Sequence, residues 1–186
     1  MTDDRQGSRR TADALLLVDV FDDFQHEDGA ALQRSFEAAQ PHMLQALADA
    51  RAAGVPVVYA NDTKGHWHGD RNLLLERALD GPAGDLIRPL APATDDRFVV
   101  KPRYSAFDLT PLELILDELG ITRLLLAGAT TEMCVAQTAI AARERELKVT
   151  LLLDACAHID ADNARIAVAY LERVVGVRVE RSAVRS

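Results

Sequence analysis

The stretch LLLAGATTEMCVAQTAIAARER, residues 124–145, contains in order the pattern of a strand, a turn and a helix. Its apolar start predicts a buried β-strand, the small residues after it predict a tight turn, and the spacing beyond Cys134 predicts a helix. Cys134 therefore stands at the N-terminal end of a helix, just past a buried strand. A thiol in that position is either inert, because cysteine packs well as a small apolar side chain, or activated by the unpaired N–H groups and partial positive charge of the helix end.

The same order of strand and helix recurs along the whole chain. We predict strands at 13–21, 55–60, 97–101, 122–128, 148–156 and 176–180, helices at 32–53, 73–80, 110–120, 132–147 and 162–174, and loops at 61–72 and 81–96. Such β-α-β units, with right-handed crossovers, predict a parallel sheet covered by helices on both faces. The expected fold is thus α/β, three-layered and doubly wound, and its ligands should bind beyond the carboxyl ends of the strands.

Composition narrows the class of protein. The 186 residues are 48% hydrophobic and 27% charged, which is ordinary for one globular domain, and their net charge of -8 argues against a nucleic-acid partner. The apolar runs are too short to span a membrane. Residues 1–11 are expected to form a disordered polar tail without a signal peptide, and residues 12–186 a single domain. Two cysteines, Cys134 and Cys156, without a secretory signal favour a cytoplasmic location.

Reactive side chains stand at the ends of three predicted strands. Asp19 ends the first strand, Lys101 ends the strand 97–101, and Cys134 follows a third strand by one turn. Each alone has an ordinary structural explanation, as a capping acid, a solvated lysine or a packed thiol. Their joint appearance at equivalent strand ends predicts that all three converge on one crevice. Cys156 has no evident base beside it, and we assign it to packing.

Three segments, LLLVDVFDDF, FVVKPRYSAF and GATTEMCVAQTA, resemble the signature segments of the isochorismatase-like cysteine hydrolases. That superfamily includes nicotinamidases and N-carbamoylsarcosine amidases, and the resemblance covers nearly the whole chain. It implies a six-stranded parallel sheet of the Rossmann-like kind and a homo-oligomer, either a dimer or a tetramer. It also implies a catalytic triad of Asp19, Lys101 and Cys134, and a cis peptide bond between Ala129 and Thr130.

Those residue types suit the hydrolysis of an amide-type C–N bond. The Cys134 thiolate would attack a carbonyl carbon and form a thioester, while Asp19 moves the proton and Lys101 stabilises both negative charges. Backbone N–H groups of Thr130 and Cys134 are the expected oxyanion hole. We therefore predict a cysteine-dependent hydrolase of a small molecule that needs no cofactor. Two alternatives are a vinyl-ether hydrolase of the isochorismatase type, which needs no nucleophilic cysteine, and a catalytically silent binding or scaffold subunit.

The predicted substrate-binding residues are Phe21, Trp67 and Tyr104, because aromatic side chains near a small site form walls for planar or apolar groups. Phe21 stands where most of the family has glutamine, so it either reshapes the pocket or simply packs. Trp67 is equally consistent with a core position. Arg103 either pairs with a carboxylate of the substrate or lies exposed on the surface.

The loop at 61–72, NDTKGHWHGDRN, departs from the pattern of the nicotinamidases, which carry an Asp-x-His pair of metal ligands there. Asp62 is present, but the residue two positions later is Lys64. His66 and His68 either bind a metal from an extended segment or belong to an exposed polar loop, and no third ligand is evident. We therefore predict no metal, which disfavours nicotinamide as the substrate.

Overall fold

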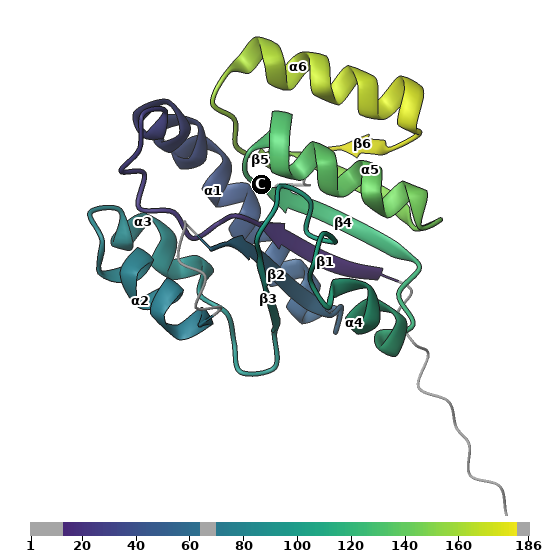
Figure 1. Ribbon diagram of the computed structural model, residues 1–186, viewed down its shortest axis with the longest axis horizontal. Helices are drawn as coiled ribbons and strands as arrows, with labels where there is room; N and C mark the ends of the chain where they lie inside the picture. Colours follow the sequence, from purple (N-terminus) through teal and green to yellow (C-terminus); the bar gives the residue numbers. More distant parts are fainter. Residues whose placement is uncertain (1–12, 64–69, 182–186) are drawn as a thin grey trace, which may run out of the picture.

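The structure, a computed structural model, describes residues 13–63 and 70–181. Six parallel strands form one sheet in the order β3-β2-β1-β4-β5-β6 (Figure 1). The strands are β1 (Asp13–Val18), β2 (Val57–Asp62), β3 (Arg97–Lys101), β4 (Arg123–Gly128), β5 (Lys148–Cys156) and β6 (Arg178–Glu180). The prediction of a doubly wound α/β fold with a six-stranded parallel sheet is confirmed.

Helices cover both faces of this sheet. They are α1 (Gly29–Ala52), α2 (Arg71–Asp80), α3 (Gly84–Ile87), α4 (Leu112–Leu119), α5 (Ala136–Glu144) and α6 (Ala161–Tyr170). One wide turn, η2 (Thr131–Val135), leads into α5, another, η3 (Leu171–Val175), extends α6, and a tight turn, η1 (Arg88–Leu90), follows α3. The segment 81–96, predicted as loop, thus contains a short helix. Pro89, one of the three prolines of this segment, lies within the first two positions of the tight turn, where no backbone N–H is needed.

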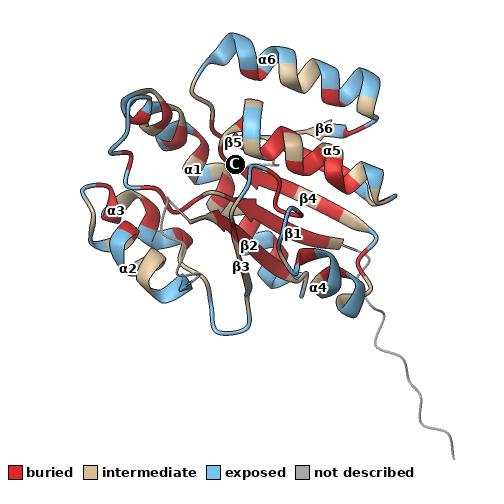
Figure 2. Cartoon of the chain, in the orientation of Figure 1, coloured by how far each residue is buried: buried red, intermediate tan, exposed pale blue. Residues whose placement is uncertain are grey.

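The apolar run of β1 is buried on both faces. Leu16 and Val18 belong to the cluster that includes side chains of α4 and α5, whereas Leu15 and Leu17 belong to the cluster that includes side chains of α1. Figure 2 shows the central strands as the most continuously buried part of the chain. Burial between two helical layers explains why this strand is apolar at every position rather than at alternate ones.

Strand β1 is shorter than predicted and ends at Val18 rather than Phe21. Asp19 has a φ of 48°, which turns the chain out of the extended conformation at the carboxyl edge of the sheet. Beyond that turn the backbone bonds to a side chain rather than to a neighbouring strand. The Phe21 N–H donates to Asn61 Oδ1 at 2.9 Å. The turn places Asp19 at the edge of the sheet instead of within it.

The direction of winding reverses between β1 and β4. From β1 the chain builds outward through β2 and β3 on one side, and β4, β5 and β6 extend the sheet on the other. In open parallel sheets such a reversal leaves a crevice at the carboxyl ends of the two strands. Gly128, which ends β4, has a φ of +123°, and a Cβ there would lie 2.0 Å from the carbonyl oxygen of Val18. The two backbones therefore approach each other at this crevice as only glycine allows.

Candidate active site

Asp19, Lys101 and Cys134 meet at this crevice. Lys101 Nζ lies 2.7 Å from Asp19 Oδ2 and 3.5 Å from Cys134 Sγ, and the thiol also hydrogen-bonds the Asp19 carboxyl group. The chain thus brings together three side chains from the ends of three different strands, as their positions in the sequence predict. Their roles in catalysis stay a prediction at this point.

Backbone groups hold the ion pair in place. Lys101 is fully buried, and its ammonium group donates to the Arg103 carbonyl oxygen at 3.1 Å as well as to Asp19. The other oxygen of Asp19 accepts the Asp62 N–H at 2.6 Å. Because each charged group has hydrogen-bond partners besides its ion-pair partner, the geometry is fixed before any ligand arrives.

Burial and the opposite charge of the partner have opposing effects on the pKa values of Asp19 and Lys101. Burial raises the pKa of Asp19, although the ammonium group of Lys101 and the hydrogen bonds to the carboxylate oppose it. Burial by itself would lower the pKa of Lys101, but the charges of Asp19 and Cys134 outweigh it, so that the pKa of Lys101 lies above its usual range. A carboxylate with a raised pKa is a better proton acceptor than one on the surface.

Burial, together with the negative charge of Asp19, raises the pKa of the Cys134 thiol to about 12. The thiol therefore lacks the lowered pKa that activation at a helix end would give it. Loss of hydration and the adjacent carboxylate outweigh the ammonium group of Lys101. The resting thiol is therefore neutral, and a base must remove its proton before it can act as a nucleophile.

A cavity of about 630 Å³ opens over these residues, and its lining includes Asp19, Cys134 and two of the candidate substrate-binding residues, Phe21 and Tyr104. Phe21 is almost fully buried, and its ring lies 5.7 Å from that of Tyr59, so this side chain both packs and lines the cavity. Tyr104 is exposed. The cavity thus offers one fixed aromatic wall and one aromatic side chain that faces solvent.

Other predicted residues fall away from the site or outside the described part of the chain. Arg103 is exposed and does not line the cavity; only its carbonyl oxygen contributes, as an acceptor for Lys101. Trp67, His66 and His68 lie outside the described residues. Cys156 is buried, with Sγ 3.9 Å from the Leu126 carbonyl oxygen, which confirms its assignment to packing.

Neither a metal cluster nor a membrane span is found in the described segments. Within 13–63 and 70–181, no three His, Cys, Asp or Glu side chains are grouped so that they could share a metal ion. In the same segments no helix has the length and apolar character needed to cross a bilayer.

The turn that carries Cys134 is tied to the strand beside it. The peptide bond between Ala129 and Thr130 is cis, as the family resemblance implies. The next residue, Thr131, donates from both its N–H and its hydroxyl group to the Ala157 carbonyl oxygen, at 2.8 and 2.9 Å. The residue directly after β5 therefore holds the turn on which the proposed oxyanion donors, Thr130 and Cys134, lie.

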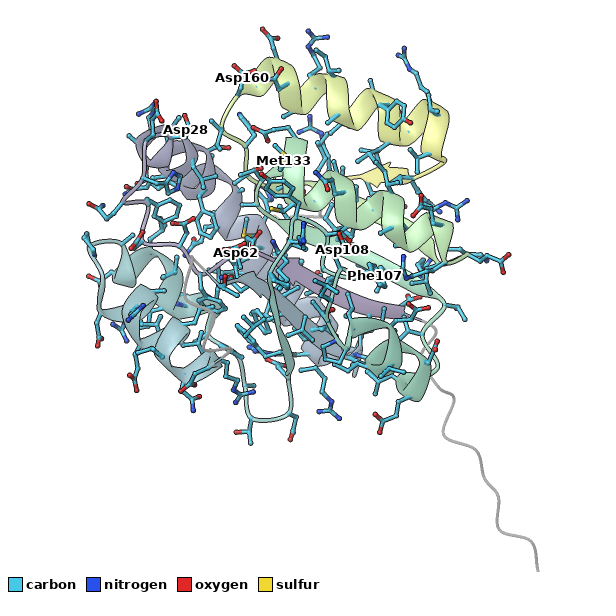
Figure 3. All side chains as sticks on the ribbon, in the orientation of Figure 1. Asp28, Asp62, Phe107, Asp108, Met133 and Asp160 are labelled. Atoms are coloured by element: carbon cyan, nitrogen blue, oxygen red, sulfur yellow. The ribbon has the colours of Figure 1, made fainter. Side chains whose placement is uncertain are left out.

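Glu132 has a structural role that the sequence does not reveal. Glu132 Oε1 accepts the N–H groups of Ile159 and Asp160 at 2.8 and 3.0 Å, and so joins the Cys134 turn to the start of α6, where Figure 3 labels Asp160. The contact spans 27 residues, and nothing in the local pattern signals it. Asp62, also labelled in Figure 3, stands where the nicotinamidases carry a metal-binding Asp, and its backbone N–H donates to Asp19 Oδ1 at 2.6 Å.

Comparison with known proteins places this geometry in a family. The Isochorismatase domain matches residues 13–181. An uncharacterized isochorismatase family protein of Bacillus subtilis, YaaI, is 32% identical over 162 residues, which are 87% of this chain and 90% of that protein. The streptothricin hydrolase of Streptomyces noursei is 34% identical over 86% of this chain and 60% of its own length.

Two solved structures agree with that match. The N-carbamoylsarcosine amidase of Thermoplasma acidophilum superposes with a TM-score of 0.69 and 29% identity, over 92% of this chain and 96% of its own. The nicotinamidase PncA of Bacillus subtilis gives a TM-score of 0.69 and 27% identity, over 92% of this chain and 100% of its own. The chain belongs to the isochorismatase family and is one of its hydrolases.

Proposed function

We propose that this chain is a cysteine-dependent hydrolase that cleaves the C–N bond of a small amide or ureido compound. The observation that carries the proposal is the placement of Lys101 Nζ 2.7 Å from Asp19 and 3.5 Å from Cys134, two residues that line the cavity. Several relatives support the class of bond, since their names include an N-carbamoylsarcosine amidase, a ureidoacrylate amidohydrolase and nicotinamidases.

In the first half of the reaction, Asp19 accepts the thiol proton of Cys134 as Sγ attacks the carbonyl carbon of the substrate. The carbonyl oxygen becomes an oxyanion and is bound by the N–H groups of Thr130 and Cys134. The C–N bond then breaks, Asp19 returns the proton to the departing nitrogen, and a thioester remains on Cys134. Lys101 stabilises the negative charge as it moves from the carboxylate to the sulfur.

In the second half, water attacks the thioester carbonyl and Asp19 takes a proton from that water. The C–S bond breaks, the acid product leaves, and the proton returns to Cys134 as a thiol. The substrate is a small molecule whose flat or apolar part lies against Phe21 and Tyr104, which line the cavity. We also propose a cytoplasmic location for the enzyme and a homo-oligomeric assembly.

The test is ammonia release from a panel of small amides, ureido acids and nicotinamide, with wild type, Cys134→Ala and Cys156→Ala compared. Cys134→Ala is expected to lose at least about 10³-fold in kcat, because no other thiol reaches the cavity. Cys156→Ala is the matched control, since Cys156 is the other free thiol and lies outside the lining. It should keep nearly full activity.

Two results would contradict the proposal. Equal ammonia release by Cys134→Ala would remove the nucleophile from the mechanism. No release from any compound by folded wild type, together with cleavage of a vinyl ether, would favour the isochorismatase-type alternative. Mass spectrometry of a stopped reaction adds a direct readout, because the thioester is expected as an acyl group on the peptide that contains Cys134.

A further inference from the structure

The ion pair of the site joins two strands that are not neighbours in the sheet. Asp19 follows β1 and Lys101 ends β3, and β2 lies between these two strands. Adjacent strands lie about 4.8 Å apart, so the two backbones are separated by about twice that distance. The carboxylate and the ammonium group nevertheless lie 2.7 Å apart. The carboxyl end of β2 is therefore the place from which the direction of Asp19 can be fixed.

Asn61, at that end of β2, is a buried polar residue whose side chain bonds the turn after β1. It is 1% exposed. Its Oδ1 accepts the Phe21 N–H at 2.9 Å, and its Nδ2 donates to the carbonyl oxygens of Phe21 at 3.2 Å and Asp62 at 3.4 Å. One side-chain amide thus satisfies both the N–H and the C=O group of Phe21, which lie beyond the end of the strand.

Three successive residues of β2 hold the turn at Asp19 from different sides. Asp19 has a φ of 48°, which is uncommon for a residue other than glycine and persists only where surrounding contacts hold it. Its N–H donates to the Ala60 carbonyl oxygen at 2.8 Å, and its Oδ1 accepts the Asp62 N–H at 2.6 Å. Asn61 holds Phe21, two residues further along the chain. The backbone before the carboxylate, the backbone after it and the carboxylate itself are each bonded to β2.

We infer that Asn61 is a positioning residue of the proposed hydrolase: its side-chain amide fixes the backbone at Phe21 and thereby aims the Asp19 carboxylate at Lys101 and Cys134. The inference rests on the proposed function, because it concerns the proton transfer assigned to Asp19. Asn61 is not among the described residues that line the cavity, so it acts through Asp19 and not on the substrate. A general base must lie within hydrogen-bond reach of the proton that it accepts, so a small rotation of this turn slows the reaction.

The first test measures ammonia release by Asn61→Leu from the best amide of the panel. Leucine has a similar size but cannot form the hydrogen bonds, so kcat is expected to fall about 10²-fold, with a smaller change in KM. Val58→Ala is the matched control, because Val58 is fully buried on the same strand and outside the described lining. It should keep kcat within about threefold of wild type. Circular dichroism verifies that each variant is folded under the assay conditions.

A second variant, Asn61→Asp, separates hydrogen bonding from packing. It keeps the acceptor for the Phe21 N–H, but only its protonated form can donate to the Phe21 carbonyl oxygen. Burial raises the pKa of the introduced carboxyl group, so lowering the pH restores the donor. The ratio of its kcat to that of wild type should therefore rise at least about threefold from about pH 8 to about pH 5.5, whereas the ratio for Asn61→Leu stays constant. A ratio that does not change for either variant would overturn the inference, as would an Asn61→Leu variant with the kcat of wild type.

Alkylation of Cys134 tests the same geometry without catalysis. The charge of Asp19 contributes to the raised pKa of the thiol, so a carboxylate that turns away should increase the thiolate fraction. At about pH 7.5, iodoacetamide should label Cys134 several-fold faster in Asn61→Leu than in wild type, a change in the same direction as in Asp19→Asn, and Val58→Ala should match wild type. An unchanged rate in Asn61→Leu would overturn the inference. If wild type hydrolyses no amide while the faster labelling is seen, the proposed function fails and the positioning of Asp19 by Asn61 stands.

Discussion

The thiol proton of Cys134 is favoured by some of its surroundings and disfavoured by others. Loss of hydration and the charge of Asp19 favour the thiol, Lys101 favours the thiolate, and the balance raises the pKa of the thiol to about 12. A permanently ionised cysteine would react with any electrophile that enters the cavity. In the proposed mechanism a neutral thiol acts only when its proton can pass to Asp19, which would couple its reactivity to the presence of an oriented carbonyl group.

This ionisation state predicts the pH dependence of labelling. Because the pKa of Cys134 is raised, the thiolate fraction is small at neutral pH and grows with pH, so its alkylation rate with iodoacetamide should rise roughly tenfold per pH unit up to about pH 10. Peptide mass mapping checks this, and labelling of buried Cys156 reports unfolding in the same sample. A plateau that begins between pH 6 and pH 8 would show a low pKa and contradict the prediction.

Lys101 is predicted to stabilise the fold as well as the chemistry. Lys101→Met leaves the Asp19 carboxylate buried without its partner, and the free energy of unfolding should fall by about 3–5 kcal/mol. Urea denaturation measures this. As a control, Arg165→Met breaks the exposed pair with Asp162 and should cost no more than about 1 kcal/mol.

A second substitution separates loss of the ion pair from loss of packing. In the double variant of Lys101→Met with Asp19→Asn, no unpaired charge remains, so most of the lost stability should return although activity does not. A double variant no more stable than Lys101→Met would mean that the cost arises from packing alone.

At the scale of elements, the approach of β4 to β1 positions the turn that carries Cys134. Gly128→Ala would place a Cβ 2.0 Å from the Val18 carbonyl oxygen, and we expect a loss of more than about 4 kcal/mol or failure to fold. Gly54→Ala is the matched control, because Gly54 also has a positive φ, of +67°, but no atom lies within 4 Å of its added Cβ. It should cost about 1–2 kcal/mol.

Urea denaturation of the two glycine variants distinguishes steric contact from backbone conformation. If both lose the same free energy, the conformation of glycine alone accounts for the effect, and the close approach of the strands is not what requires Gly128. If Gly128→Ala folds, ammonia release should still fall, because the shifted strand end moves the Cys134 turn.

The order of strands and helices could be predicted from the sequence because the spacing of apolar residues and the positions of turn residues are local signals. Asp19, Lys101 and Cys134 could be placed together because strand ends of a parallel sheet share one edge. The features that could not be predicted depend on contacts between residues far apart in the sequence. The turn at Asp19 ends β1 early, and the raised pKa of Cys134 follows from burial that local pattern does not reveal. The contact of Glu132 with Ile159 lies beyond any local signal in the same way.

At the scale of the whole molecule, one outer helix has the character of an interface. Ile166, Tyr170 and Val174, spaced four residues apart on α6 and η3, are 60%, 51% and 67% exposed. Figure 1 shows α6 on the outside of the molecule, beyond α5 and β6. Three large apolar side chains in one stripe on a chain with a net charge of -8 are what a contact between two copies would cover.

If homo-oligomerisation uses this stripe, Ile166→Lys should weaken it. In a two-fold contact the same face is presented by both copies, so one substitution places two like charges in one apolar interface. The dissociation constant should rise at least about tenfold, measured by light scattering over a dilution series. Leu114→Lys is the control, because Leu114 is 72% exposed on α4 and lies outside the stripe. A wild type that is monomeric at every concentration would contradict the assembly, and an oligomer unaffected by Ile166→Lys would place its contact on another face.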